Sequence, residues 1–383
     1  MLHLLGTHTL GSTVASWNEF KNCCKFMTMS IAELEKLRAS SEWFPEKEYL
    51  AQRTWLQTTC ARILSCGPIP KHVAFIMDGN RRFARKSSIE RQEGHMEGFK
   101  KLAETLQWCL DLGITEVTVY AFSIENFKRS KEEVDGLMHL AREKFERLLE
   151  EKDEIMKHGV CIRVLGDLTL LPKDLQAVIA DAMYLSRNNT RAILNVCMAY
   201  TARHEITNAF KELSWGVNKG LIKPSDISEE VMEKCFYTRH SPDPDLLVRT
   251  SGEVRLSDFL LWQSSYSVLA FVDVLWPEYS IWHFFSGILY YQRNHGQVQA
   301  AREVRDMQRQ QAIHDSDRQE VMKILDEENK SPNQTEALPQ RISEYARQRE
   351  QRIKHFVETL EAKRTQKLLN MLPARTASDL TSH

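Results

Sequence analysis

The chain has 383 residues, with 51 lysines and arginines against 52 aspartates and glutamates. This near-neutral balance argues against general nucleic-acid binding, so any basic site must be local. Eight cysteines without a CxxC pair or cysteine–histidine ligand spacing indicate neither a zinc site nor a disulfide framework, and favour a reducing compartment. Apolar runs such as Val268–Trp276 are interrupted by charge and are far shorter than the roughly 20 residues of a transmembrane helix.

The first 70 residues divide into two parts. Residues 1–40 show no sustained periodicity, and we expect a poorly ordered extension that lacks the basic and apolar regions of a secretory signal. Over 41–70, the apolar residues from Trp43 to Leu64 are compatible with an amphipathic helix. The role of this helix stays open, because its aromatic residues suit a membrane interface, contact with a growing lipid, or packing against the main domain.

The stretch from His72 to Arg85 carries a strong local signal. Val73–Met77 predicts a buried strand, and Asp78, Gly79 and Asn80 follow it as a turn. Four cations come next: Arg81, Arg82, Arg85 and Lys86. At the carboxyl end of a strand, such a turn favours a phosphate group, and the Asp78 carboxylate would repel that phosphate unless Mg²⁺ lay between them. The alternative is an ordinary turn whose arginines face solvent.

Strands and helices alternate through the central part of the chain. The sequence predicts helices at Gly94–Leu112, Lys131–Lys157, Lys173–Leu185, His204–Leu213 and Tyr279–Gln292. Further strands are expected at Val117–Phe122, Val160–Leu165, Ala192–Met198, Leu246–Val248 and Val268–Val272. This alternation predicts an α/β fold with a central, mostly parallel sheet flanked by helices on both faces.

Two more of these strands lead into polar turns. Val117–Phe122 is followed by a turn that contains Ser123, Asn126 and Arg129. Leu246–Val248 is followed by Arg249, Arg255 and Ser257, with a glycine between them, a composition suited to a second diphosphate. The acidic residues of the preceding SPDPD segment could form a metal-binding pair, but its prolines favour a surface turn.

The composition changes beyond about Asn294, where glutamine, arginine and glutamate dominate. We expect exposed or mutually packed helices at Gln297–Lys323 and Ile342–Leu369, separated by a polar linker at Ser331–Pro339. The expected organisation is therefore an extension over 1–40, an amphipathic helix over 41–70, the central domain over 71–296 and a charged helical extension over 297–383.

Three of the turns together resemble the signatures of the cis-prenyltransferases, the undecaprenyl diphosphate synthase family. They are MDGNRRFA at Met77–Ala84, AFSIENFKR at Ala121–Arg129 and LLVRTSGEVRLSDFLLWQ at Leu246–Gln263. DVLWPEY at Asp273–Tyr279 fits the same family, and the likeness is strongest to the catalytic subunits of eukaryotic dehydrodolichyl diphosphate synthases.

The resemblance implies one catalytic domain with an elongated apolar tunnel. Such transferases, the ditrans,polycis-polyprenyl diphosphate synthases, add isopentenyl diphosphate repeatedly to farnesyl diphosphate. The implied product is a long-chain dehydrodolichyl diphosphate for dolichol synthesis and protein glycosylation. The sequence contains neither the DDxxD of trans-prenyltransferases nor a Walker-type GxxxxGK[ST], which argues against trans-prenyl transfer and nucleotide binding.

The resemblance also implies roles for individual residues. Asp78 would hold Mg²⁺ on the diphosphates, and Ser123 and Asn126 would lie near the junction of the two substrates as catalytic residues. The allylic diphosphate would be bound by Gly79, Asn80, Arg81, Arg82, Arg91, His95 and Arg129. Isopentenyl diphosphate would be bound by Arg249, Arg255 and Ser257. Negative charge grows on the departing diphosphate, where Mg²⁺ and arginines lower the barrier most.

One position departs from the bacterial homodimeric members of the family. They carry a metal-binding glutamate eleven residues after the serine equivalent to Ser257, and here that position is Val268. The departure matches the eukaryotic catalytic subunits, which work with a non-catalytic subunit of the Nogo-B-receptor type. The resemblance thus implies a heteromer, peripheral on the cytoplasmic face of the endoplasmic reticulum membrane. The alternative is a non-catalytic paralogue that acts as a scaffold, against which the retained Asp78 and arginines argue.

Overall fold

The computed structural model describes Trp43 and residues 54–327 and 338–372. The extension expected over 1–40 and nearly all of the linker expected at Ser331–Pro339 lie outside these residues. Of the amphipathic segment expected from Trp43 to Leu64, the described helix is α4, Trp55–Leu64, which begins with a capping box at Thr54.

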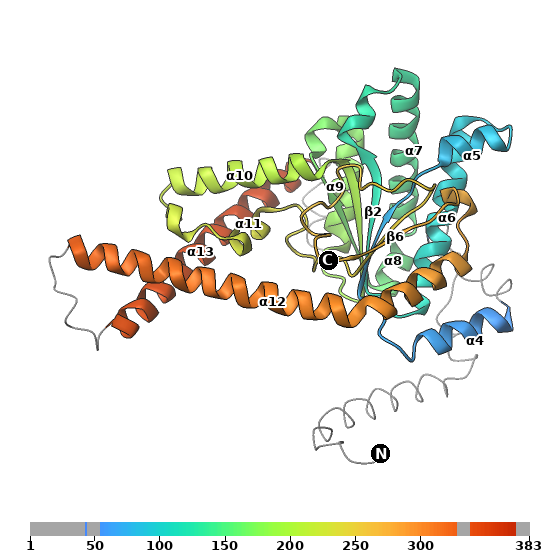
Figure 1. The fold of residues 1–383 in the computed structure, drawn as a ribbon. Coiled ribbons are helices and arrows are strands. Elements are labelled where there is room, and N and C mark those ends of the chain that lie inside the picture. The colour runs from blue at the N-terminus through green and yellow to red at the C-terminus, as the bar shows by residue number, and fades with distance from the viewer. Residues whose placement is uncertain (1–42, 44–53, 328–337, 373–383) are drawn as a thin grey trace, which may run out of the picture.

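A sheet forms the centre of the fold (Figure 1). It has six strands, in the order β3-β4-β2-β1-β5-β6. Every neighbouring pair is parallel, which confirms the expected α/β fold with a mostly parallel sheet. The strands are β1 His72–Ile76, β2 Glu116–Ser123, β3 Val160–Leu165, β4 Ala192–Tyr200, β5 Leu246–Arg249 and β6 Val268–Phe271. Ile76 pairs with Arg249, so the turns after β1 and β5 begin side by side.

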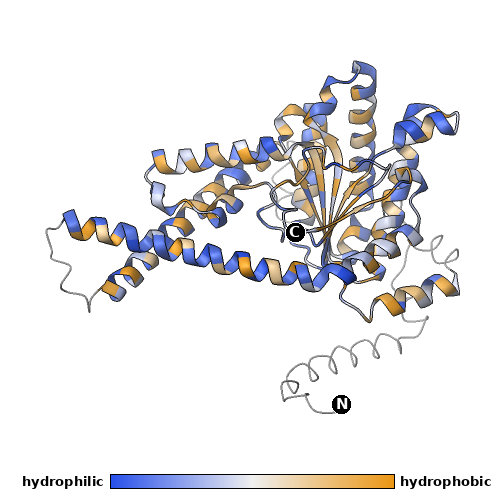
Figure 2. Ribbon diagram, viewed as in Figure 1, coloured by the Kyte–Doolittle hydropathy of each residue, from blue (hydrophilic) through white to orange (hydrophobic). Residues whose placement is uncertain are grey.

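Alternate strand residues point to opposite sides of this sheet. Helices pack on one face, whereas the other face is packed against Leu256, Phe259 and Leu260, which lie in the loop between β5 and β6. Val73 and Phe75 of β1 join a large cluster with α6 and α7, whereas Ala74 and Ile76 join a smaller cluster on the other face. The strands are strongly hydrophobic, while the C-terminal helices are mostly hydrophilic (Figure 2). The helices after α4 are α5 Asn80–Lys86, α6 Arg91–Asp111, α7 Lys131–Glu150, α8 Lys152–His158, α9 Lys173–Ser186, α10 Ala202–Asn218, α11 Glu229–Cys235, α12 Ile281–Glu327 and α13 Leu338–Leu369.

Three helix predictions were wrong in detail. Helix α5 starts directly after the Asp78 turn, where the apolar pattern predicted a helix only from Gly94, because a two-turn helix with one buried residue leaves little periodic signal. The single helix predicted over Lys131–Lys157 is broken at Glu151, which leaves helical geometry between α7 and α8. The two helices predicted on either side of Asn294 are one continuous helix of 47 residues, α12.

The SPDPD segment is neither a metal-binding pair nor a surface turn. Asp245 is buried, and its carboxylate accepts the backbone N–H of Lys71 at 2.7 Å and the guanidinium of Arg302 at 2.7 Å. Asp243 pairs with Arg305 at 3.0 Å. The prediction of a surface turn was wrong because both arginines come from α12, about 60 residues away in the chain. These ion pairs hold α12 against the amino end of the sheet.

The C-terminal extension is a packed layer. Phe356 and Leu360 of α13 are fully buried in a cluster with Leu213 of α10 and Val231 of α11. Ion pairs surround this cluster: Arg352 with Asp226, Arg364 with Glu212, and Arg239 with Glu361. Helix α13 is thus packed against α10 and α11, which the sequence did not predict, and it also contacts α12 through the ion pair of Arg349 with Asp317 at 2.9 Å.

Candidate active site at the carboxyl ends of the strands

The turn after β1 is held by the turn after β5. The backbone carbonyl of Asp78 accepts the hydroxyl protons of Thr250 at 2.9 Å and Ser251 at 2.8 Å. Gly79 follows with φ +108°, in the region that favours glycine, and it caps the start of α5. The side chain of Asp78 is thereby fixed at the edge where both strands end.

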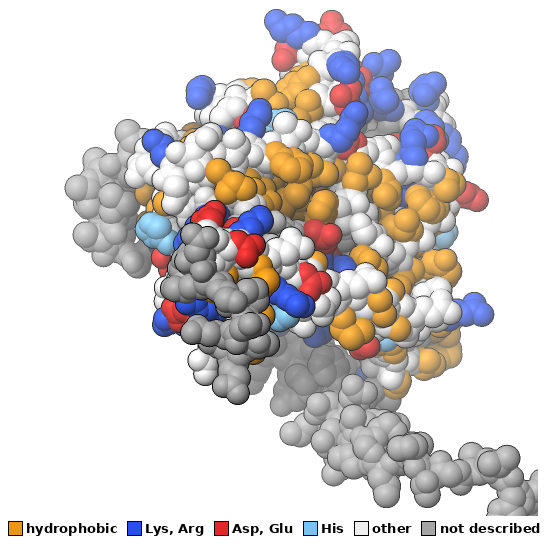
Figure 3. Space-filling model, turned by 60° about the vertical axis from the view of Figure 1, so that its left-hand side comes forward, with side chains coloured by type: hydrophobic (Ala, Val, Ile, Leu, Met, Phe, Trp, Pro, Cys, Tyr) orange, Lys and Arg blue, Asp and Glu red, His pale blue; other side chains and the backbone are white. Residues whose placement is uncertain are grey.

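All of the site residues predicted from the sequence line one cleft of about 1110 Å³ at this edge. Lys and Arg side chains gather at the top of the molecule, the end at which α5 lies (Figure 3). The cleft brings together Asp78, Gly79, Asn80, Arg81, Arg82, Arg91, His95, Ser123, Asn126, Arg129, Arg249, Arg255 and Ser257. Lining residues that sequence reasoning missed are Tyr120, Glu125, Arg203, Glu253 and Asp258. Asp258 directly follows Ser257 in a recognised motif, and that position was an available signal.

One half of the cleft is built around Arg249. This side chain is buried, and its guanidinium donates to the Asp78 carboxylate at 2.9 Å, to the Ser257 hydroxyl at 2.6 Å and to the Arg255 carbonyl at 2.5 Å. Its Nε is buried without a hydrogen-bond partner among the described residues. Arg82 approaches the other Asp78 oxygen at 3.6 Å. Asp78 therefore lies between two guanidinium groups.

The other half of the cleft is organised by Glu133 of α7. This buried carboxylate accepts Arg129 at 2.8 Å and lies 3.7 Å from Arg81 and 3.9 Å from Arg91. A single carboxylate leaves most of the donors on three guanidinium groups free for an anion with several oxygens. Burial, and after it the positive charge of Arg129, lower the pKa of His95 to about 4. His95 is thus neutral at pH 7 and can donate one N–H.

Ser123 and Asn126 shape the short helix that carries Arg129 into the cleft. The Ser123 hydroxyl accepts the Glu125 N–H at 3.2 Å, and the Asn126 side-chain oxygen accepts the Ser123 N–H at 3.0 Å. This is a reciprocal capping box for the 3₁₀ helix Ile124–Lys128. The Ser123 hydroxyl also bonds to the Tyr120 side chain, whereas the amide protons of Asn126 meet no acceptor among the described residues and are available to a ligand.

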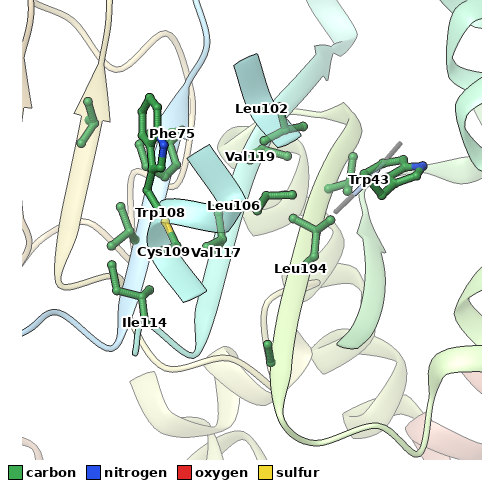
Figure 4. Packing of buried hydrophobic residues seen from close by; sticks show 14 of the residues in the cluster. Trp43, Phe75, Leu102, Leu106, Trp108, Cys109, Ile114, Val117, Val119 and Leu194 are labelled. Carbon is green, nitrogen blue, oxygen red and sulfur yellow. The ribbon is translucent and has the colours of Figure 1, made fainter. Parts of the chain in front are cut away.

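An apolar cavity of about 150 Å³ adjoins the cleft. Its walls come from α6, α7, β2 and β4, and its lining includes Leu102, Val119 and Trp43 (Figure 4). Leu102 and Val119 lie next to each other between α6 and β2, and Trp43 closes the side toward α7. The cavity and the cleft share the lining residues Met77, Asn80, His95, Tyr120, Ala121 and Leu137. A ligand with a charged head and an apolar tail fits this pair of spaces.

The donor set fits Mg²⁺ only as an ion that bridges protein and ligand. The described residues contain no group of three or more His, Cys, Asp or Glu side chains that could hold a metal. Mg²⁺ is commonly bound by one or two carboxylates together with substrate phosphates, and Asp78 supplies one carboxylate among the arginines. Val268 is buried at the start of β6, paired with Leu246, and does not line the cleft.

Known proteins resemble this chain over the same region. The family model of undecaprenyl diphosphate synthase, a prenyltransferase, matches residues 76–299. The chain is 58% identical over 306 residues to the dehydrodolichyl diphosphate synthase complex subunit of Homo sapiens, and the match covers 80% of this chain and 92% of the human protein. It is 49% identical over 213 residues to the geranylgeranyl-diphosphate-specific tritrans,polycis-undecaprenyl-diphosphate synthase of Pyrococcus horikoshii, covering 56% of this chain and 80% of that protein.

A solved structure shares the fold. Lavandulyl diphosphate synthase from Lavandula x intermedia, in complex with dimethylallyl diphosphate, superposes with a TM-score of 0.56 at 32% identity. The superposition covers 58% of this chain and 95% of the plant enzyme. The resemblance predicted from the three motifs is confirmed, and the chain belongs to the undecaprenyl diphosphate synthase family of prenyltransferases.

Proposed function

We propose that this chain is the catalytic subunit of a cis-prenyltransferase that makes dehydrodolichyl diphosphate from farnesyl diphosphate and isopentenyl diphosphate. The observation that carries the proposal is the cleft itself. Two sets of arginines flank Asp78 at one edge of the sheet, and an apolar cavity opens beside them. The names of the human, mouse and fission-yeast relatives, all dehydrodolichyl diphosphate synthase complex subunits, support the same activity.

Each half of the cleft suits one diphosphate. The half around Glu133 takes the allylic diphosphate, through Gly79, Asn80, Arg81, Arg82, Arg91, His95 and Arg129. The half around Arg249 takes isopentenyl diphosphate, with Arg255 and Ser257, while Ser123 and Asn126 lie where the two meet. The arginines fix both anions and so align the reacting carbons, while the apolar cavity accepts the hydrocarbon tail.

Asp78 holds the metal in this proposal. Bound Mg²⁺ would supply positive charge to the diphosphate that leaves the allylic carbon. Arg81, Arg82 and Arg129 add donors to the same leaving group, whose charge rises as the bond breaks. Their effect is largest in the transition state, because the ground-state diphosphate carries less charge on the departing oxygen.

The proposal includes a second, non-catalytic subunit of the Nogo-B-receptor type. Asp78 alone gives Mg²⁺ few protein ligands among the described residues. The position of the metal-binding glutamate in the bacterial homodimeric members is here the buried Val268, which cannot bind a metal. The words "complex subunit" in the names of the eukaryotic relatives support a partner. A partner that adds groups to the cleft would complete the site.

The direct test measures incorporation of labelled isopentenyl diphosphate with farnesyl diphosphate and Mg²⁺. We expect strong incorporation by this chain together with a Nogo-B-receptor-type subunit, and little by either protein alone. Equal activity without the partner would retain the chemistry and overturn the heteromer. No incorporation by a folded, associated pair would instead favour a non-catalytic scaffold.

We also propose peripheral attachment to the cytoplasmic face of the endoplasmic reticulum membrane, through α4. No helix in the described ranges is both long and apolar enough to cross a bilayer. On α4, however, the side chains of Trp55 and Ile63 are 78% and 66% exposed. An aromatic and an aliphatic residue on a short surface helix suit the interface between lipid headgroups and acyl chains.

Replacing both Trp55 and Ile63 with serine should weaken membrane binding. Burial of these two side chains in lipid contributes roughly 3–5 kcal/mol, so the vesicle partition coefficient measured by flotation should fall by roughly 10²-fold to several 10³-fold. Phe210→Ser is the matched control, because Phe210 is 57% exposed on α10, in another part of the fold. Equal flotation of the double variant and the control would place the membrane contact elsewhere.

A further inference from the structure

The turn that carries Ser257 into the cleft has an unusual backbone. Ser257, Asp258 and Leu260 all have positive φ angles, 48°, 61° and 45°, although none of them is glycine. Residues with a Cβ adopt this left-handed region at an energetic cost, and aspartate tolerates it better than most. The fold must therefore hold the turn in place from outside.

The first turn of α10 provides this support. The carbonyl oxygen of Asp258 accepts the Ala202 N–H at 2.7 Å. Its carboxylate accepts the backbone N–H of Arg203 at 3.0 Å and the Arg203 Nε–H at 2.8 Å. The Asp258 side chain is 13% exposed, whereas that of Arg203 is 75% exposed. Asp258 is thus the enclosed member of the pair, and Arg203 reaches over it from the rim of the cleft.

The supported turn is the one that orients the diphosphate ligands. Ser257 Oγ accepts a proton from Arg249, and the same guanidinium contacts Asp78. On the other side, the Tyr120 hydroxyl lies 3.4 Å from the Ser257 carbonyl and 3.2 Å from the Tyr200 carbonyl, and its single proton is shared between these two acceptors. A shift of Asp258 would move Ser257 and release one of the groups that fix Arg249.

We propose that Asp258 is a positioning residue for isopentenyl diphosphate, and that Arg203 is its anchor. The inference rests on the proposed assignment of Arg249, Arg255 and Ser257 to that substrate. Asp258 does not touch the substrate; it acts through the backbone of Ser257. Arg203 has a second effect, because it neutralises a carboxylate that would otherwise repel a diphosphate.

Three substitutions at Asp258 separate its contributions. Asp258→Asn removes the charge but keeps an acceptor for the Arg203 N–H and tolerates positive φ. Asp258→Gly permits positive φ but loses both side-chain bonds. Asp258→Ala loses the bonds and the backbone preference together. Steady-state kinetics of each variant, assayed with its partner subunit, give KM for both substrates, and thermal unfolding reports the folded state.

We expect KM for isopentenyl diphosphate to rise about tenfold in the alanine and glycine variants, and to stay within about twofold in the asparagine variant. KM for farnesyl diphosphate should change little in all three, a split that a general loss of stability would not produce. A glycine variant with normal KM would overturn the inference, since backbone preference alone would then explain the turn. Equal changes in both KM values would overturn it as well.

Arg203→Met tests the anchor. If Arg203 acts through Asp258, then adding Arg203→Met to Asp258→Ala should raise KM no further, whereas additive effects would mean that Arg203 binds the substrate itself. A different result would show that the assignment of Arg249, Arg255 and Ser257 to isopentenyl diphosphate is itself wrong. In that case Arg249→Lys, which alters the proposed subsite directly, would leave KM for isopentenyl diphosphate unchanged while the wild-type enzyme still turned over.

Discussion

Replacing Asp78 with alanine should lower kcat by about 10³-fold or more, and should also lower the stability, because the buried Arg249 loses its carboxylate partner. The carboxylate lies between Arg249 and Arg82 at the junction of the two proposed diphosphate subsites. Without it, the cleft retains its cations but loses the group proposed to hold Mg²⁺ between protein and substrate. The bonds that fix the turn involve the backbone carbonyl of Asp78, so the substitution leaves them intact. Single-turnover rates and unfolding curves, measured on the complex, check both halves of the expectation.

Glu253→Ala is the matched control for this substitution. Glu253 also lines the cleft, lies 3.8 Å from Arg82, and has a side chain that is 31% exposed against 33% for Asp78. It differs in lying beyond the end of β5, in the turn rather than at the β1 edge. We expect Glu253→Ala to lose at most about tenfold in kcat. Equal losses of kcat in the two variants would mean that the overall charge of the cleft determines the rate and that Asp78 has no specific role in catalysis.

A rise in the Mg²⁺ concentration needed for half-maximal rate would distinguish metal binding from other roles. Asp78→Asn keeps the shape of the side chain but is a weaker ligand, so it should retain some activity at high Mg²⁺. Asp78→Ala should not be rescued by added metal. A variant with low kcat and an unchanged Mg²⁺ requirement would assign Asp78 to the orientation of Arg249 instead.

The position of the cleft was predictable from the sequence because of a general property of parallel sheets. Polar turns after β1, β2 and β5 lie at one edge, and β1 is hydrogen-bonded to both of the other strands. Motif residues far apart in the chain, such as Asp78 and Arg249, therefore meet without any information on side-chain packing. The six strands were predictable for a related reason: short apolar runs that alternate with helices are typical of one parallel sheet.

Contacts between helices and turns could not be read in the same way. Asp245 looked like a turn residue because its partner, Arg302, belongs to a helix whose path depends on the packed sheet. Glu133 has a partner close in sequence, Arg129, but its approach to Arg81 and Arg91 depends on the fold, as does the pairing of Asp258 with Arg203. A charged residue in a sequence does not reveal whether a distant charge will neutralise it. The break at Glu151 has no signal in the local sequence either, because no glycine or proline lies near it between α7 and α8.

Gly79→Ala should destabilise the protein by about 2–5 kcal/mol, through backbone strain and overlap together. A methyl group at this position would lie 2.3 Å from Ser251 Oγ and 3.1 Å from the Cα atom of Leu275. The first atom belongs to a small side chain, but the second is backbone and cannot easily move. Thermal unfolding should show a midpoint lower by roughly 5–15 °C. Activity should fall as well, because a displaced Ser251 releases the Asp78 carbonyl.

Gly113→Ala separates strain from overlap. Gly113 also has a positive φ, +75°, but nothing lies within 4 Å of an added methyl group. This control should lower the free energy of unfolding by only about 1–2 kcal/mol and leave kcat unchanged.

Removing the Ser251 hydroxyl alone should lower the free energy of unfolding by about 1 kcal/mol, because the hydrogen bond to the Asp78 carbonyl is lost. Combined with Gly79→Ala, Ser251→Ala should recover part of the stability, since it removes the atom in closest overlap, while the contact with Leu275 persists. Equal destabilisation by Gly79→Ala and Gly113→Ala would mean that the turn after β1 yields to the methyl group, and that the two turns do not hold Asp78 rigidly.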